Sequence, residues 1–393
     1  MSRVMIPKSE YRERALKAGK LIKEKGLDVL VVNGTESDYA NPRYFSAFWP
    51  VFERSGVAIN QDGDTALMVG PESPIFAADK AVIKDIFMMR EYIESANPQY
   101  PHLADKMQTY VDVFKHLGVN ESKIKIGLAS PIDTTMVMYE GLTKAYPNAE
   151  IVDASDIMVS LRQIKSENEI ACLREGARIS DIAIKEVIEA IKPGMTELQL
   201  VGIAHSVFYR EGAEAEGLPI YCFSQKSTQH AISRSGYDKI QKGDLVQLNF
   251  SAKIDGYSSA IGLPISMGPL TGEKREIVEF LLEAHRWTTD KMSQGAGLPA
   301  SELAIEYEKF FKDNGREDVY VYGPCHSTGM IEVEAPWIET ISTFNLEAGM
   351  TYQIDTFGIG SDFGCRWEKP IVIRENTIEL LSPEVGTIYE IDC

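Results

Sequence analysis

Two histidines in the second half of the chain have the chemistry expected of proton-transfer residues. His230 lies in a polar segment, QKSTQHAISRSG over 225–236, and a free imidazole titrates near pH ~6.5, which suits a proton shuttle. His326 follows Gly323-Pro324-Cys325, a predicted loop that would end near the cavity of the site. We interpret both as candidate catalytic residues. The alternatives are a surface-loop histidine at 230 and a histidine bonded to the backbone at 326.

Two carboxylates, Asp355 and Glu368, fall on predicted late strands at 350–355 and 367–373. Charged groups among apolar strand residues are costly unless they are paired or liganded. A salt bridge to Arg366 or Lys369 would satisfy them, and so would a catalytic site. Together with His326 they could form a site of one imidazole and two carboxylates for a single metal ion.

Other side chains have the chemistry of substrate binding. Arg54, with Phe52 and the preceding Trp49-Pro50, could hold a carboxylate, because the guanidinium fork matches it. Trp49, Trp337 and Tyr257 are either core aromatics or a cradle for a cationic nitrogen. Glu332 and Glu334 would share one face of a strand. We interpret Cys222 and Cys325, which flank the predicted pocket, as inert thiols.

A predicted hairpin over 243–264, GDLVQLNFSAKIDGYSSAIGLP, positions this chemistry. Apolar and polar residues alternate along it, which is typical of a half-buried strand, and Asp255-Gly256 supplies a tight turn. Either the polar face lines a cavity, or the hairpin is amphipathic and its polar face is exposed to solvent.

The flanking sequence predicts two domains, over residues 1–160 and 161–393. In the first, helices at 9–25 and 134–145 alternate with strands at 27–32, 56–60, 65–69, 123–128 and 150–152, which indicates an α/β domain. In the second, capping boxes at 166–169 and 196–199 open two helices, and further helices are predicted at 272–292 and 301–314. With the strands at 245–251, 257–265, 350–355 and 367–373, this is an α+β domain.

Composition narrows the class of function. A net charge of -18 over 393 residues argues against nucleic acid as a partner, because phosphates require clustered Lys and Arg. The five cysteines are widely spaced and contain no C-x-x-C pair, so a disulfide scaffold or structural zinc site is not expected. No signal core, membrane span or glycine-rich phosphate loop is visible. We expect a cytoplasmic protein with no membrane partner.

Five ordered motifs in the second half resemble the creatinase/prolidase family, whose catalytic domain has the pita-bread fold. They are the helix entry at 161–170, the turn at 192–197, the return strand at 256–259, the H-x-x-G…E-x-P pattern at 326–336, and the pair 349–355 and 364–368. The resemblance implies an α/β N-terminal domain and an α+β catalytic domain. It also places Glu334 on the E-x-P glutamate.

The metallopeptidases of that family hold two divalent cations with two Asp, one His and two Glu. Those positions are Asn249, Ala260, His326, Asp355 and Glu368 here, so both aspartates of the hairpin are missing. Val333 replaces the family's second histidine. The same hairpin pattern resembles creatinase, the metal-free branch.

The resemblance to creatinase extends to three further residues. His230 corresponds to its catalytic histidine. Phe52 and Arg54 correspond to residues that reach into the partner subunit's site and hold the substrate carboxylate. Gly262 and the region of Trp337 depart from creatinase's substrate-binding Glu and Arg.

We therefore predict a metal-independent, creatinase-like hydrolase of a non-peptide C–N bond in a small carboxylate-bearing nitrogen compound. His230, Asp355, Glu368 and His326 would be catalytic. Phe52, Arg54, Tyr257, Glu334 and Trp337 would bind substrate in a homodimer whose site is completed by the neighbour's N-terminal domain. No cofactor is expected, or a single divalent ion on His326, Asp355 and Glu368. The alternatives are an Xaa-Pro dipeptidase or aminopeptidase with at most one metal, a sulfonium or ammonium carboxylate lyase, and a non-catalytic binding module.

Overall fold

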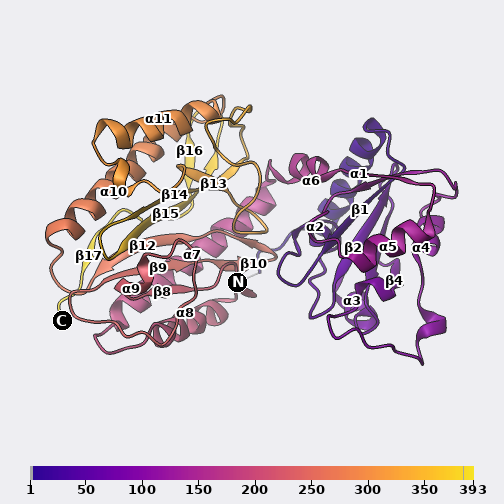
Figure 1. Ribbon diagram of the computed structural model, residues 1–393, viewed down its shortest axis with the longest axis horizontal. Helices are drawn as coiled ribbons and strands as arrows, with labels where there is room; N and C mark the ends of the chain where they lie inside the picture. The colour runs from indigo at the N-terminus through magenta and orange to yellow at the C-terminus, as the bar shows by residue number, and fades with distance from the viewer. Residues whose placement is uncertain (1–2, 384) are drawn as a thin grey trace. The chain divides into compact units, whose positions relative to one another are not determined.

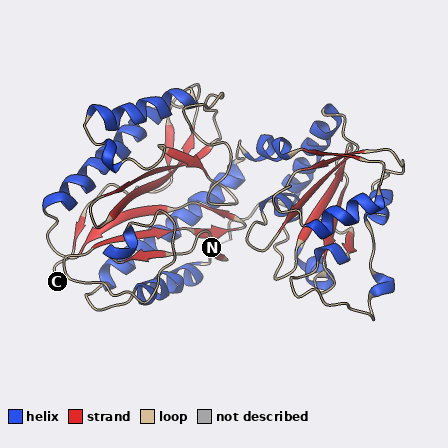
Figure 2. Cartoon of the chain, in the orientation of Figure 1, coloured by secondary structure: helices blue, strands red, loops and turns tan. Residues whose placement is uncertain are grey.

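The computed structural model describes residues 3–383 and 385–393. It divides into two compact units (Figure 1). One is Ile6–Arg162, and the other is residues 3–5 together with Gln163–Cys393. Each unit combines β-sheet with helices packed against it (Figure 2).

The first unit is built on a six-stranded mixed sheet in the order β4-β3-β2-β1-β5-β6. Strand β1 pairs in parallel with β5 and antiparallel with β2. The predicted α/β character is confirmed, and the structure adds β4, whose three residues are too few to show a period. The strands are β1 Val29–Gly34, β2 Ser55–Asn60, β3 Thr65–Val69, β4 Ile86–Met88, β5 Lys125–Leu128 and β6 Glu150–Asp153.

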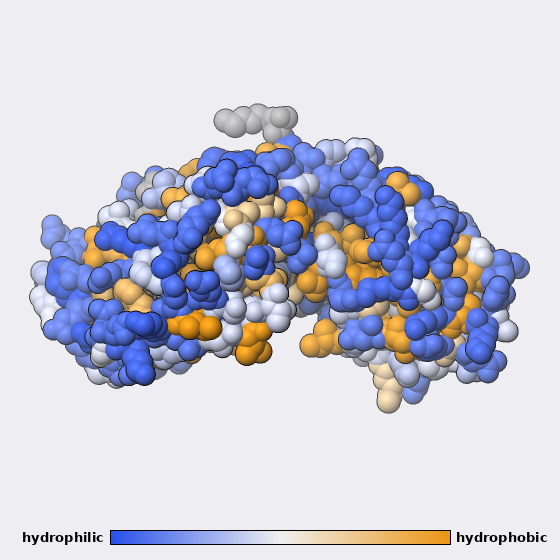
Figure 3. Space-filling view, turned by 90° about the horizontal axis from the view of Figure 1, so that it is seen from above, coloured by the Kyte–Doolittle hydropathy of each residue, from blue (hydrophilic) through white to orange (hydrophobic). Residues whose placement is uncertain are grey.

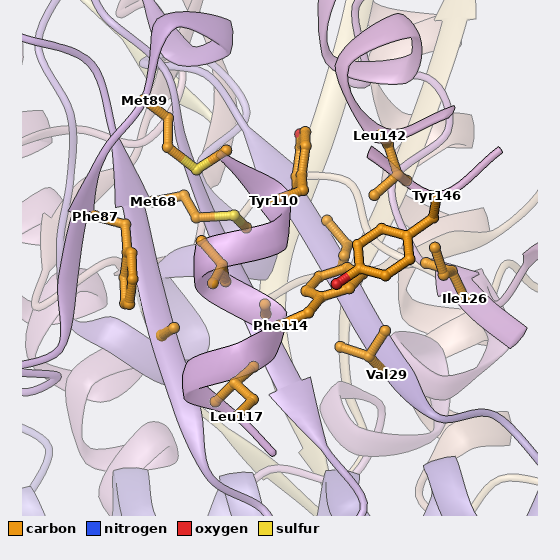
Figure 4. Packing of buried hydrophobic residues seen from close by; sticks show 14 of the residues in the cluster. Val29, Met68, Phe87, Met89, Tyr110, Phe114, Leu117, Ile126, Leu142 and Tyr146 are labelled. Atoms are coloured by element: carbon orange, nitrogen blue, oxygen red, sulfur yellow. The ribbon is translucent and has the colours of Figure 1, made fainter. Parts of the chain in front are cut away.

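Helices α4 and α5 help to close the apolar core of this unit (Figure 4). The rings of Phe114 and Tyr146 stack with centroids 5.0 Å apart, and Met68, Ile126 and Leu142 belong to the same buried cluster. Of the helices, only α1 and α5 were predicted. The helices are α1 Lys8–Glu24, α2 Ala40–Ser46, α3 Pro74–Lys80, α4 Tyr110–His116, α5 Met136–Ala145 and α6 Ser155–Arg162.

The second unit contains an eight-stranded sheet whose main path runs β13-β14-β15-β12-β9-β8, with β16 on β15 and β17 on β12. Its long strands are the late strands of the sequence prediction. The strands are β8 Tyr221–Phe223, β9 Leu245–Phe250, β12 Ile261–Ser266, β13 Cys325–Ser327, β14 Thr351–Ile359, β15 Gly364–Ile373, β16 Ile378–Leu380 and β17 Tyr389–Glu390.

The predicted hairpin over 243–264 is present but divided between two sheets. Strands β9 and β12 pair antiparallel in the large sheet. Between them, β10 (Ala252–Ile254) and β11 (Tyr257–Ser258) pair around Asp255-Gly256, whose φ angles of 48° and 92° suit a tight turn. The division arises because β10 also pairs with β7 (Ala215–Glu216), in a separate three-stranded sheet.

Both predicted capping boxes form. The side chains of Ser166 and Thr196 accept hydrogen bonds from the backbone N–H at position N3 of α7 and α8. The side chains of the N3 residues, Glu169 and Gln199, accept in turn from the backbone N–H of the cap residues. The helices of this unit are α7 Glu167–Ala190, α8 Glu197–Glu211, α9 Gln225–Thr228, α10 Gly272–Met292 and α11 Ala300–Asp313.

Helix α10 determines which face of β15 carries polar side chains. Trp367 is fully buried and its indole N–H donates to the carbonyl of Val278 in α10 at 3.2 Å. Because successive strand residues point to opposite faces, Arg366 and Glu368 project from the other face of the sheet. The polar site therefore lies on the face opposite α10.

Polar residues cover much of the face seen in Figure 3, in keeping with the net charge of -18. Among the described residues, no helix has the length and apolarity needed to cross a bilayer.

Candidate active site

A row of polar side chains crosses the large sheet on one face. His326 of β13 pairs in register with Gln353 of β14, and Asp355, two residues further on, pairs with Glu368 of β15. Glu368 in turn pairs with Gly262 of β12, opposite Asn249 of β9. Strand register thus brings together residues that lie far apart in the chain.

His326, Asp355 and Glu368 form a compact buried cluster. His326 Nε2 lies 3.8 Å from Glu368 Oε1 and 4.0 Å from Asp355 Oδ2. One donor atom from each residue lies within 4.8 Å of the others. His326 Nδ1 lies 3.1 Å from the Ser327 carbonyl, so an Nδ1–H tautomer leaves the Nε2 lone pair facing the carboxylates.

Arg366 and Tyr322 hold Asp355 in place. Arg366 Nε lies 3.1 Å from Asp355 Oδ1, and the Tyr322 hydroxyl donates to Asp355 Oδ2 at 2.6 Å. Arg366 Nη2 donates at 2.8 Å to the Tyr322 hydroxyl and to the Ala231 carbonyl. The sequence offered an Asp355–Arg366 salt bridge as the alternative to a catalytic role; the structure contains this ion pair at a residue that also belongs to the His326–Asp355–Glu368 cluster.

Burial governs the protonation of the cluster. Removal from water raises the pKa of Glu368 well above its usual range, and the neighbouring Asp355 and Glu332 raise it further. Burial also lowers the pKa of His326, which favours the neutral imidazole, the form that binds metal ions. Glu368 is therefore the carboxyl of the cluster best suited to hold a proton.

Glu332 is a third carboxyl beside the cluster, and it was not predicted to be catalytic or substrate-binding. It accepts hydrogen bonds from the Ser251 hydroxyl at 3.2 Å and from Gln353 Nε2 at 3.1 Å, and burial raises its pKa to about 8. The only signal in the sequence was its spacing from Glu334. Tyr322 was also missed, and no motif in the sequence indicates it.

Glu334 and Tyr257 have their side chains engaged in packing. Glu334 pairs with the buried Lys165 at 3.3 Å and accepts from the backbone N–H of Met330 and Ile331, so it fixes the loop that carries Glu332. The Tyr257 hydroxyl donates to Glu169 of α7 at 2.6 Å. These contacts tie elements together and point to structural roles.

Trp337 lies beside the cluster, and His230 is next in the chain to a residue that contacts Arg366. The Trp337 ring is 45% exposed and its centroid lies 5.8 Å from that of His326. His230 is exposed, and the carbonyl of the adjacent Ala231 accepts from Arg366.

Phe52 and Arg54 belong to the first unit. Phe52 is 79% exposed with a φ of 60°, and Arg54 Nη1 donates to the carbonyl of Ile93 at 2.8 Å.

The donor set fits one divalent cation. An imidazole nitrogen and two carboxylates facing one another are a common ligand set for divalent ions, and Asp355 Oδ1 accepts no hydrogen bond within residues 3–383 and 385–393.

The donor set does not fit a second cation. Asn249 directs its NH₂ to Glu368 Oε2 at 2.6 Å, and its oxygen accepts from Gln247 at 2.9 Å. Ala260 has no donor atom.

Fold and site together define a two-domain hydrolase with a pita-bread catalytic domain, as predicted. The chain belongs to metallopeptidase family M24, whose model matches residues 171–375, and the creatinase/prolidase N-terminal domain model matches residues 14–164.

Individual relatives span both branches of the family. An Xaa-Pro dipeptidase of Pyrococcus furiosus is 25% identical, over 94% of this chain and 98% of its own. A creatinase of a Bacillus species is 27% identical, over 62% of this chain and 63% of its own. The crystal structure of an X-Pro aminopeptidase from Thermotoga maritima has a TM-score of 0.81 at 20% identity, covering 97% and 99% of the two chains.

These comparisons overturn the predicted function. The metal-independent hydrolase of a non-peptide C–N bond is wrong, because a metallopeptidase model matches the catalytic domain and Xaa-Pro dipeptidases recur among the relatives. The prediction gave too much weight to the missing hairpin aspartates, since a carboxylate–imidazole cluster remains without them.

Proposed function

We propose that the chain hydrolyses the amide bond of Xaa-Pro dipeptides, using at most one divalent cation held by His326, Asp355 and Glu368. The observation that carries this proposal is the cluster itself, one imidazole and two carboxylates within 4.8 Å on one face of the sheet. The similarity to Xaa-Pro dipeptidases along nearly the whole chain supports the substrate class. When bound, the cation supplies Lewis-acid polarisation of a carbonyl or a water.

Each side chain of the cluster has a distinct task in this proposal. His326 offers Nε2 as a neutral ligand, oriented by its contact with the Ser327 carbonyl. Arg366 and Tyr322 fix the orientation of Asp355. Glu368 supplies the second carboxylate ligand, and its Oε2 accepts from Asn249 at 2.6 Å. His230, which is exposed, takes a proton from water and delivers it to the leaving prolyl nitrogen.

The chain is further proposed to act as a homodimer. Phe52 and Arg54 of one subunit would complete the site of the other by holding the substrate carboxylate. The exposure of Phe52 supports this, because a large apolar side chain in water gains by becoming buried in an interface.

Release of proline from Ala-Pro tests the function. Purified protein is assayed with Mn²⁺, Zn²⁺ or chelator present, with creatine as the comparison substrate. We expect proline release that depends on the cation and disappears in His326→Ala. Turnover of creatine without turnover of Ala-Pro would overturn the proposal.

A further inference from the structure

Glu332 has no positively charged partner within the described part of the chain. Its two carboxylate oxygens accept only neutral donors, the Ser251 hydroxyl and the Gln353 amide. The nearby guanidinium of Arg366 is already committed to Asp355, Tyr322 and the Ala231 carbonyl. A half-buried carboxylate that has only neutral donors is stabilised when a cation binds to it.

Gln353 provides a second, independent sign of a missing ligand. Its side chain is fully buried, yet its amide oxygen accepts no hydrogen bond from any residue that the structure describes. Leaving a buried acceptor unpaired costs about 1–3 kcal/mol, so such an atom indicates a donor that arrives with a ligand. The nitrogen of the same amide is already bonded to Glu332, so the carboxylate and the free acceptor are adjacent.

The place of this pair in the sheet connects it to the proposed site. Gln353 lies opposite His326 in register and two residues before Asp355, on the same face of β14. Glu332 is outside the group of residues whose donor atoms can share one metal ion. A ligand at Glu332 and Gln353 would thus lie beside the metal-binding cluster and would not be part of it.

We propose that Glu332 and Gln353 bind the positively charged primary amine of the substrate, and this rests on the proposed dipeptide hydrolysis. An ammonium group offers three N–H donors and one positive charge. The Glu332 carboxylate supplies charge-assisted acceptors and the Gln353 oxygen supplies a neutral one. The pair would select dipeptides with a free N-terminus over those whose N-terminus is blocked.

The test compares Ala-Pro with N-acetyl-Ala-Pro in wild type, Glu332→Gln and Glu339→Gln. Glu339 is exposed in the same loop, so its variant is a control with the same change in charge. KM is measured where the dipeptide is cleaved, and Kd by calorimetry where it is not. Glu332→Gln should raise the KM or Kd of Ala-Pro by about 10- to 100-fold. It should change the KM or Kd of N-acetyl-Ala-Pro by less than about twofold. Glu339→Gln should change neither.

A second variant guards against a folding defect. Gln353→Met keeps the length of the side chain and removes its acceptor. It should raise the KM or Kd of Ala-Pro, but not that of N-acetyl-Ala-Pro, by about 3- to 10-fold. Thermal melts establish that each variant is folded.

Equal losses for both dipeptides, no loss for either, or loss of bound Mn²⁺ in Glu332→Gln would overturn the inference. Absence of cleavage in the wild type would instead overturn the proposed function, and the calorimetric Kd values would still decide the role of Glu332.

Discussion

The amide nitrogen of Asn249 donates to Oε2 of Glu368 at 2.6 Å, while the amide oxygen accepts from Gln247 at 2.9 Å. The two bonds orient the amide with its donor toward the carboxylate cluster, so Asn249 contributes no oxygen ligand there. The neutral N–H of Asn249 therefore gives Glu368 part of the stabilisation that a second cation would provide.

Metal stoichiometry should follow from this orientation. We expect about one Mn²⁺ per chain in the wild type, because three donor residues remain for it. The double variant Asn249→Asp/Ala260→Asp should bind a second Mn²⁺, since it adds two carboxylates to the site. Elemental analysis and calorimetry measure both. Two ions in the wild type would contradict the orientation of Asn249.

Removing the guanidinium should destabilise the fold. Arg366→Met leaves Asp355 buried without its cationic partner, and we expect a loss of about 3 kcal/mol in the free energy of unfolding at pH 7. Mn²⁺ should raise the free energy of unfolding of Arg366→Met by more than it raises that of the wild type. Urea denaturation with and without the ion measures both effects, and the exposed Arg210→Met is the control.

Removing the exposed imidazole of His230 should slow turnover and leave the fold intact. His230 is exposed, so His230→Ala should lower kcat by about 100-fold through loss of proton transfer, with little change in Tm. His116, an exposed histidine of the first unit, provides the control variant His116→Ala. Unchanged turnover in His230→Ala would assign His230 to the surface alone.

Acid sensitivity should arise in part from His285 of α10. Its burial, reinforced by Lys369 and Arg286, lowers its pKa well below the ordinary value of 6.5. The unfolded chain therefore binds a proton below pH ~6.5 that the native state does not, and stability falls as pH falls. Between pH 7.5 and 5.5 the wild type should lose up to about 1.4 kcal/mol more than His285→Gln. An equal loss of stability between pH 7.5 and 5.5 in the two proteins would contradict this role of His285.

Shared sites can be detected by mixing two inactive variants. Arg54→Ala lacks the proposed carboxylate-binding residue, and His326→Ala lacks the cluster imidazole. If each site takes residues from two subunits, exchange of subunits should restore about a quarter of wild-type activity, because mixed dimers contain one intact site. Measurement of proline release after co-refolding tests this. No recovery would place Arg54 and His326 in the same subunit's site.

Local patterns in the sequence were sufficient to predict most of the long elements. The capping boxes at Ser166 and Thr196, the Asp255-Gly256 turn and the alternation along the 243–264 hairpin are short-range signals, and the predicted elements appear in the structure. They also placed Asp355 and Glu368 on strands, where ionised side chains need partners. Short elements such as β13 and α9 carry too few residues to show a period.

Tertiary structure alone decided how the site is completed. The register of β13, β14 and β15 brings His326, Asp355 and Glu368 together, and register between distant strands is not encoded in any local motif. No local motif predicts that Tyr322 donates a hydrogen bond to Asp355. None predicts the ion pair of Glu334 with Lys165 or the hydrogen bond from Gln353 to Glu332. The sequence by itself determined which charged groups must find partners, because burial is costly. Which partner each one found depended on loops and strands that meet only in the folded chain.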